Sequence, residues 1–195
     1  MIPAFILVLL AVAYRIATGL LIQSGATWLS NFAPLAAIAL CSAAYFPMRY
    51  KFTVPLIALF ISDFVLNWHY NASWFDSLIL CRYLTLGLIG VIGWSLQNRA
   101  SLKTMLPASI LGSTIFYVVT CVFGWLTDVG YAKNFAGLIQ SLTVGLTSYS
   151  GTPSWMFYRN SLVSDLVFTF VFVLAVQFSR RAEFAPAKSA LPRPA

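Results

Sequence analysis

The sequence has 195 residues, of which 60% are hydrophobic and only 9% are charged, and its mean hydropathy is +0.84. Soluble domains carry about 25% charged residues, and a water-soluble fold of this size cannot hide so much apolar surface. The net charge of +7 is not accompanied by a basic stripe with interleaved aromatic residues, which argues against nucleic-acid binding. The composition therefore excludes an ordinary soluble domain and predicts an integral membrane protein embedded in a lipid bilayer.

Six apolar runs follow one another along the chain, and a bilayer span needs roughly 20 mostly apolar residues. The runs cover residues 2–22, 32–46, 52–68, 74–96, 105–126 and 158–178. They predict an all-α protein with about six transmembrane helices, forming a single domain over residues 1–180. The C-terminal tail, residues 181–195, is rich in proline, alanine and basic residues, and we expect it to be disordered.

The basic residues of the loops predict the orientation of the bundle in the membrane. Arg49 and Lys51 lie in the second loop, and Arg99 and Lys103 lie in the fourth, whereas the first and third loops contain no lysine or arginine. Cytoplasmic loops carry an excess of lysine and arginine. Loops two and four and the basic tail are therefore predicted to be cytoplasmic, and an even number of spans places the N-terminus on the same side.

The fifth loop, residues 127–158, is the only long one and faces outward in this orientation. A long ordered loop among short ones is more often a binding element than a spacer. Residues 135–149 within it are expected to form either a lid helix or a shallow re-entrant segment.

Charged residues inside the predicted spans gather in the outer half of the bundle. An intramembrane charge costs about 2.5–3.5 kcal/mol on insertion scales, and it usually marks a functional site or an ion pair. These residues are Arg15, Asp63, Arg82, Arg159 and Asp165. Two interpretations stay open. The charges either surround a polar cavity that opens outward beneath the fifth loop, or they form ion pairs that fix the packing of the helices.

Aromatic residues lie at the same outer rim, and four of them are candidates for contact with a ligand. They are Trp68, Tyr131, Tyr149 and Tyr158. An interfacial aromatic belt explains many such residues without any ligand.

Motifs of membrane enzymes and ATPases are missing from the sequence. The single histidine, His69, lies in a predicted outer turn, and neither HExxH nor GxSxG is present. A nucleotide-binding motif is also missing, so the chain is not expected to hydrolyse ATP by itself.

Three short segments carry a family pattern through their order and spacing. They are residues 31–37 continuing to 43–47, residues 54–56 leading to Ser62 and Asp63, and residues 159–162 leading to 164–166. The pattern resembles small bacterial membrane proteins related to the substrate-binding (S) components of energy-coupling-factor transporters. Within that group the chain is most similar to the solitary BtuM-type cobalamin (vitamin B12) transporters. The resemblance implies a six-helix S-component bundle in the bacterial inner membrane, with both termini cytoplasmic, that takes up cobalamin from the outside.

The resemblance also implies that a membrane-embedded cysteine ligates the cobalt of cobalamin and assists the removal of cyanide from cyanocobalamin. Cys81 fits this role because it lies in the outer half beside Arg82, and a thiolate is a good soft metal ligand. Cys121, also in the outer half, is the rival ligand, and a buried cysteine commonly acts as a small hydrophobic residue. The implied cobalamin site comprises Cys81, Arg82, Asp63, Trp68, Tyr131, Tyr149, Tyr158 and Arg159.

Three alternatives to cobalamin uptake are consistent with the residues. The first is an S component for another vitamin or nucleobase-like compound, the second is a membrane enzyme, and the third is an assembly subunit without a ligand. Ala13 and Ala17 match the AxxxA pattern by which S components dock on a shared energy-coupling module, although Arg15 lies between them. This match leaves open whether the chain works alone or binds an energy-coupling module as a partner.

Overall fold

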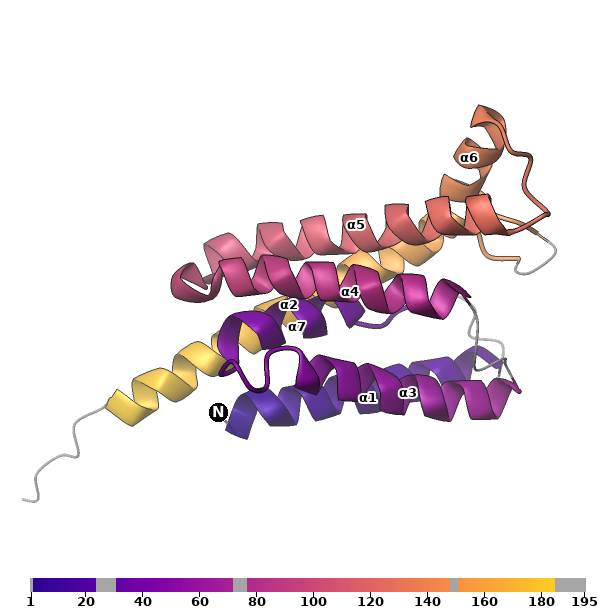
Figure 1. Ribbon diagram of the computed structural model, residues 1–195. Coiled ribbons are helices and arrows are strands. Elements are labelled where there is room, and N and C mark those ends of the chain that lie inside the picture. Colours follow the sequence, from indigo (N-terminus) through magenta and orange to yellow (C-terminus); the bar gives the residue numbers. More distant parts are fainter. Residues whose placement is uncertain (1, 24–30, 72–76, 148–150, 185–195) are drawn as a thin grey trace, which may run out of the picture.

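The computed structural model describes residues 2–23, 31–71, 77–147 and 151–184, and within them every regular element is helical (Figure 1). The helices are α1 (Ile2–Gln23), α2 (Leu35–Tyr45), α3 (Thr53–Tyr70), α4 (Ser77–Ser95), α5 (Leu102–Thr127), α6 (Phe135–Leu142) and α7 (Ser154–Phe184), with a 3₁₀ turn at Gln97–Arg99. The all-α fold class predicted from the sequence is confirmed. The predicted disordered tail, residues 181–195, falls largely outside the described residues.

Within the described residues, four helices are long and apolar enough to cross a membrane. They lie at Pro3–Leu21, Ser77–Ser95, Leu102–Thr127 and Ser154–Ser179. The second apolar run of the sequence instead forms α2, an 11-residue helix. At 1.5 Å per residue α2 is about 16 Å long, half of the roughly 30 Å hydrocarbon core of a bilayer. Six spans therefore remain a prediction.

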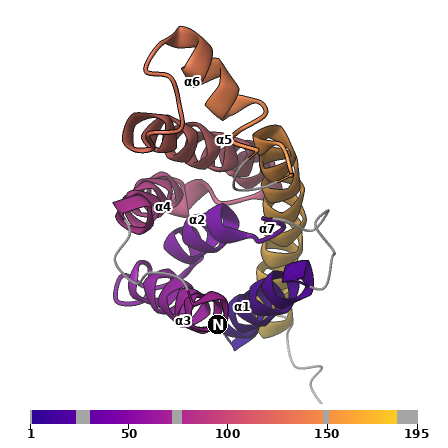
Figure 2. The same ribbon diagram turned by 90° about the vertical axis from the view of Figure 1, so that its right-hand side faces the viewer.

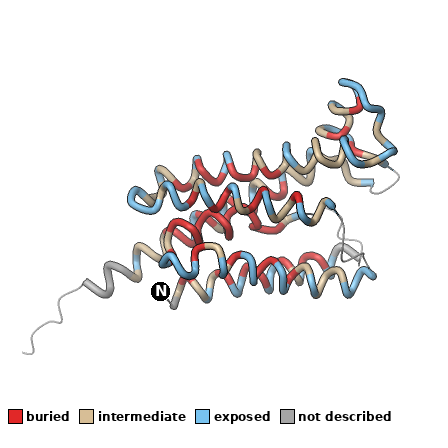
Figure 3. The backbone as a smooth tube through the Cα atoms, in the orientation of Figure 1, coloured by how far each residue is buried: buried red, intermediate tan, exposed pale blue. Residues whose placement is uncertain are grey.

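α2 lies at the centre of the bundle, with the long helices arranged around it (Figure 2). All residues from Leu35 to Ala44 are buried, so the helix is red along its length in Figure 3. Its alanines allow close packing, and α4 approaches closely at Gly93, where a Cβ atom would overlap the Leu40 carbonyl oxygen. Small side chains thus let a helix with no polar face occupy the middle of the bundle.

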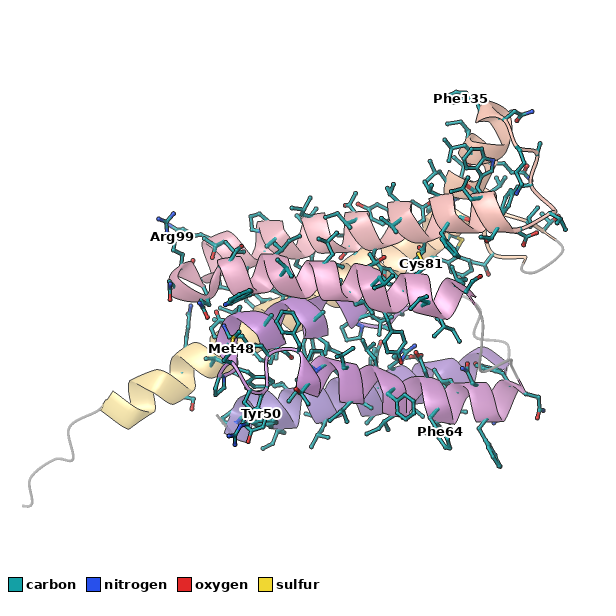
Figure 4. The ribbon with its side chains drawn as sticks, in the orientation of Figure 1. Met48, Tyr50, Phe64, Cys81, Arg99 and Phe135 are labelled. Carbon is teal, nitrogen blue, oxygen red and sulfur yellow. The ribbon has the colours of Figure 1, made fainter. Side chains whose placement is uncertain are left out.

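The connections between helices lie at two opposite ends of the bundle. Residues 46–52 and 96–101 lie at one end, together with the start of α1 and the end of α7, and Figure 4 labels Met48 and Arg99 there. We call this the basic end because Arg49, Lys51 and Arg99 lie in its connections and Lys103 lies in the first turn of α5. At the opposite end, here called the cavity end, α1, α3 and α5 finish and α4 and α7 begin, and α6 lies beside them.

Candidate functional site

A polar cavity of about 260 Å³ lies at the cavity end of the bundle. Its walls come from α1, α4, α5, α6 and the first residue of α7, and the start of α2 forms its floor. The lining side chains that carry hydrogen-bonding groups are Arg15, Asn31, Arg82, Thr120, Tyr131, Ser141 and Ser154. A smaller cavity of about 100 Å³ adjoins it and shares Asn31, Phe116, Thr120 and Cys121. The larger cavity is close to the lower end of the size range of small-molecule sites, about 300–1,000 Å³.

The shortness of α2 explains why a cavity exists at this end. α2 begins at Leu35 and occupies the half of the bundle toward the basic end (Figure 1). Residues 31–34 lead into it as irregular chain, and both Asn31 and Leu35 line the cavity. Because no helix continues from α2 toward the cavity end, the surrounding helices enclose a space there.

Asp165 holds the start of α2 in place. Its side chain is fully buried, and its carboxylate accepts hydrogen bonds from the Ala37 backbone N–H at 2.8 Å and from the Ser113 hydroxyl at 2.7 Å. The N-cap residue of α2 is Pro34, which has no capping side chain, so a carboxylate from α7 takes over that function. A negative charge at a helix N-terminus is also favoured by the helix dipole. Asp165 therefore joins α2, α5 and α7 and does not line the cavity.

Arg15 and Asp63 form an ion pair between α1 and α3. The Arg15 Nη2 atom lies 2.5 Å from the Asp63 carboxylate, and Nη1 donates to the Ser62 hydroxyl. Both side chains are largely buried. Arg15 also lines the cavity, so the bundle contains both arrangements considered for its intramembrane charges, an ion pair and a polar cavity.

Arg82 lines the cavity from α4 and differs from Arg15 in having no hydrogen-bonding or charged partner among the residues that the structure describes. Its Nε atom is buried and makes no hydrogen bond, and no hydrogen bond or ion pair of its guanidinium group occurs within the described part of the chain. An unsatisfied buried polar group in a native structure calls for an explanation, and a bound water or ion is one of the ordinary explanations.

The three cysteines occupy different environments. Cys121 on α5 lines both cavities. Cys81 is buried on α4 near the cavity end (Figure 4), where Leu78 and Arg82 on either side of it line the larger cavity but Cys81 does not. Cys41 is fully buried on α2, with its Sγ atom 3.9 Å from the Thr169 hydroxyl oxygen. The cavity wall therefore carries the rival cysteine, with the favoured one adjacent to it.

Two of the predicted aromatic contacts reach the cavities. Tyr131 lines the larger cavity. Tyr158 lines the smaller one, where its hydroxyl lies 2.9 Å from that of Thr114 and its ring stacks on Tyr117 at 4.8 Å between centroids. Tyr149 lies outside the described residues.

Trp68 and Arg159 point away from the cavities. Trp68 is 72% exposed and stacks on Phe64 along the outer face of α3. Arg159 is exposed on α7, where its guanidinium lies 5.6 Å from the Trp155 ring centroid and donates to the Asn160 side chain. A cation beside an exposed tryptophan at a helix end is the usual arrangement at a membrane interface.

Sequence reasoning missed one wall of the cavity, the face of α5 formed by Phe116, Thr120 and Gly124. These residues follow one another at intervals of four, which places them on one side of a helix. Thr120 and Gly124, a polar and a small residue four positions apart in an apolar run, are the signal that could have identified this wall.

The fifth loop forms α6, which borders the cavity. Figure 2 places α6 on the side of α5 away from α1 and α3, and only Ser141 near its end lines the cavity. The Asn134 side chain caps α6 by accepting from the Gly137 N–H at 2.9 Å, and the Lys133 ammonium donates to the Asp128 carbonyl oxygen at the end of α5 at 2.5 Å. The loop is thus fixed to the end of α5 and flanks the cavity mouth.

Comparison with known proteins identifies the family of the chain. A model for a family of unknown function, DUF6580, matches residues 1–188, so the chain belongs to this family. No curated protein and no solved structure matches the chain. The resemblance to BtuM-type transporters therefore stays a prediction.

Proposed function

We propose that this member of the DUF6580 family takes up a small solute across the bacterial inner membrane, that it binds the solute in the polar cavity, and that the solute is cobalamin. The observation that carries the proposal is the cavity itself. At the cavity end, an otherwise apolar bundle surrounds polar side chains and an arginine that has no partner among the described residues. Polar and ionisable residues within a membrane protein usually mark the path of a substrate or ion.

The orientation in this proposal follows from the charges of the two ends. The basic end carries the arginines and lysines of the short loops and is therefore placed in the cytoplasm. The cavity end then faces outward, so the cavity receives solute from outside the cell. The start of α1 and the end of α7 both lie at the basic end, so this orientation implies cytoplasmic termini.

Cobalamin enters the proposal through the cysteines near the cavity. A thiolate is a suitable ligand for cobalt, and Cys121 and Cys81 are the two candidates at this end. A corrinoid is larger than the enclosed space, so we propose that its ring lies across the mouth with the cobalt facing a thiol. Arg82, Tyr131 and Asn31 would contact the edge of the ligand that enters.

The experiment is a visible spectrum of the purified protein with cyanocobalamin. We expect the wild-type spectrum to differ from that of free cyanocobalamin. The difference should disappear in whichever variant, Cys121→Ala or Cys81→Ala, lacks the thiol that ligates cobalt. Cys41→Ala is the matched control, because Cys41 is fully buried on α2 and cannot reach the cavity. A wild-type spectrum identical to that of free cyanocobalamin would remove the thiolate role.

The volume of the cavity favours a second candidate, uptake of a smaller vitamin or nucleobase-like compound. About 260 Å³ suits a single ring system with its substituents better than a corrinoid. Equilibrium binding of a panel of small vitamins separates the two candidates. If a small vitamin binds to the wild type and its binding is lost when cavity residues are substituted, the transported solute is that vitamin and not cobalamin.

Uptake of a solute against its gradient needs a source of energy, and a separate energy-coupling module would supply it. An energy-coupling module would contact the outer surface of the bundle, and Ala13 and Ala17 are both exposed on α1. Purification of the chain with its cellular partners, in wild-type form and as Ala13→Leu/Ala17→Leu, tests whether a module binds there.

A further inference from the structure

We infer that Arg82 binds an anionic group, a carboxylate or a phosphate, carried by the ligand that occupies the cavity. The inference rests on the proposed function for the identity of the ligand as a transported solute, but the anion site itself is argued from the charges and contacts of the cavity alone.

The first step concerns the balance of charge around the cavity. Two arginines line it, Arg15 and Arg82, and no acidic side chain does so within the described residues. The charge of Arg15 is already balanced, because its guanidinium bonds to Asp63 and to Ser62. Within the described residues, the guanidinium at the cavity that has no charged partner is that of Arg82.

The second step concerns the hydrogen bonds that Arg82 leaves unmade. Its Nε atom is buried without a partner although arginine carries five N–H donors, and no side chain of the described residues accepts from the others. A guanidinium group presents its donors as a planar fork that matches the two oxygens of a carboxylate or phosphate. An anion in the cavity satisfies both the charge and the donors at once.

The third step concerns what else such a ligand would contact. Asn31, Thr120 and Ser154 supply hydroxyl and amide groups to the same cavity, and Phe116 and Tyr131 supply aromatic surface. The lining therefore fits a molecule with one anionic group and a small apolar or aromatic body. The same anionic chemistry is found in the phosphodiester of cobalamin, in carboxylate-bearing vitamins, and in the phosphate of a phospholipid headgroup.

The test uses protein purified in dodecyl maltoside without phosphate, and its first measurement is thermal unfolding. Added inorganic phosphate is compared with chloride at equal ionic strength, because an anion that binds only the folded state raises the unfolding temperature. We expect a rise for the wild type, none for Arg82→Gln, and a partial rise for Arg82→Lys. Arg99→Gln is the matched control: it removes the same group from an exposed site at the basic end and should keep the wild-type rise.

The second measurement compares ligands with and without an anionic group. Nicotinate is paired with nicotinamide, and cyanocobalamin with dicyanocobinamide, which lacks the nucleotide loop that contains the phosphodiester. In at least one pair the anionic member should bind about tenfold or more tightly, the effect expected of one charge-assisted hydrogen bond, and Arg82→Gln should abolish the preference. Native mass spectrometry completes the comparison, because a phospholipid retained by the wild type and lost from Arg82→Gln would identify the headgroup as the source of the anion.

The outcomes separate the two claims. Equal responses of the wild type and Arg82→Gln to phosphate, together with no preference for the anionic members, would overturn the anion site. A phosphate response that depends on Arg82, with no organic solute bound from either pair, would leave the anion site standing and would count against the proposed uptake of these solutes.

Discussion

Replacing Asp165 with alanine should release the start of α2 from the rest of the bundle. The Asp165 carboxylate is fully buried and accepts from the Ala37 N–H at 2.8 Å and from the Ser113 hydroxyl at 2.7 Å. Alanine leaves the Ala37 N–H without its side-chain acceptor in the interior of a membrane protein, and the Ser113 hydroxyl keeps only the Ser109 carbonyl oxygen, at 2.9 Å. It also removes the negative charge that favours the N-terminus of α2.

These contacts determine how much free energy Asp165 contributes to keeping α2 packed in the bundle. Hydrogen bonds to a charged group contribute about 1.5–3 kcal/mol each, and part of this is offset because the carboxylate no longer has to be desolvated. A net loss of about 3 kcal/mol is expected, which corresponds to about a hundredfold increase in the open population of α2. Asp165→Asn should fall between the wild type and Asp165→Ala, because its amide oxygen still accepts from the Ala37 N–H.

The chain contains its own reporter for this opening. Cys41 lies on α2 and is fully buried, so a maleimide reaches it only when α2 is released. In a Cys81→Ala/Cys121→Ala background, the rate of Cys41 labelling in detergent, followed by mass spectrometry, measures the open population. We expect Asp165→Ala to accelerate labelling about a hundredfold when opening is fast compared with the chemical step.

A matched substitution distinguishes this role from a general effect of losing an aspartate. Asp128 accepts from the Gly130 N–H at 2.8 Å in the loop after α5, far from α2 along the fold. Asp128→Ala should leave the Cys41 labelling rate unchanged. If Asp165→Ala labels no faster than Asp128→Ala, then Asp165 does not hold α2 and the reasoning is wrong.

Two further predictions concern the packing of the bundle. Gly93→Ala should destabilise the fold by about 1–3 kcal/mol, the usual range for overpacking a tight contact. Gly87→Ala, whose added Cβ atom meets no atom within 4 Å, should be neutral or slightly stabilising, and thermal unfolding followed by tryptophan fluorescence compares the two variants. Asp63→Asn should destabilise by about 3–5 kcal/mol because it leaves the buried Arg15 guanidinium uncompensated, and Arg15→Gln/Asp63→Asn should recover much of that loss. With Arg15→Gln measured alone as well, a double variant whose loss equals the sum of the two single losses would show that the two residues are not energetically coupled.

The length of α2 was not predicted, although the sequence contains the signals that set it. The apolar composition of residues 32–46 indicates that the segment is buried, and burial alone does not separate a membrane span from a short internal helix. Two prolines decide the length. Pro34 stands at the N-cap, and Pro47 disfavours helical geometry at Phe46, which is extended in the structure, so the helix ends at Tyr45.

The site was predicted in part because charges inside spans mark polar regions, but they do not say which way each side chain faces. Arg82 and Tyr131 line the cavity as expected, and Arg15 and Asp63 form one of the ion pairs considered. Trp68 and Arg159 were grouped with them by depth in the membrane, yet they lie on outer faces of their helices. Depth follows from position in a run, whereas facing depends on the rotation of each helix against its neighbours.

The most direct test of the proposed uptake is whether a reagent can reach the cavity from outside the cell. Cys121 lines the cavity and Cys41 does not, so single-cysteine proteins that retain one or the other can be exposed in intact spheroplasts to 2-sulfonatoethyl methanethiosulfonate, a small anionic reagent that does not cross membranes. If the cavity faces outward, we expect Cys121 to react and Cys41 not to react, and we expect Arg82→Gln to slow the reaction of Cys121 with the anionic reagent. Failure of Cys121 to react until the membrane is permeabilised would contradict the outward-facing cavity.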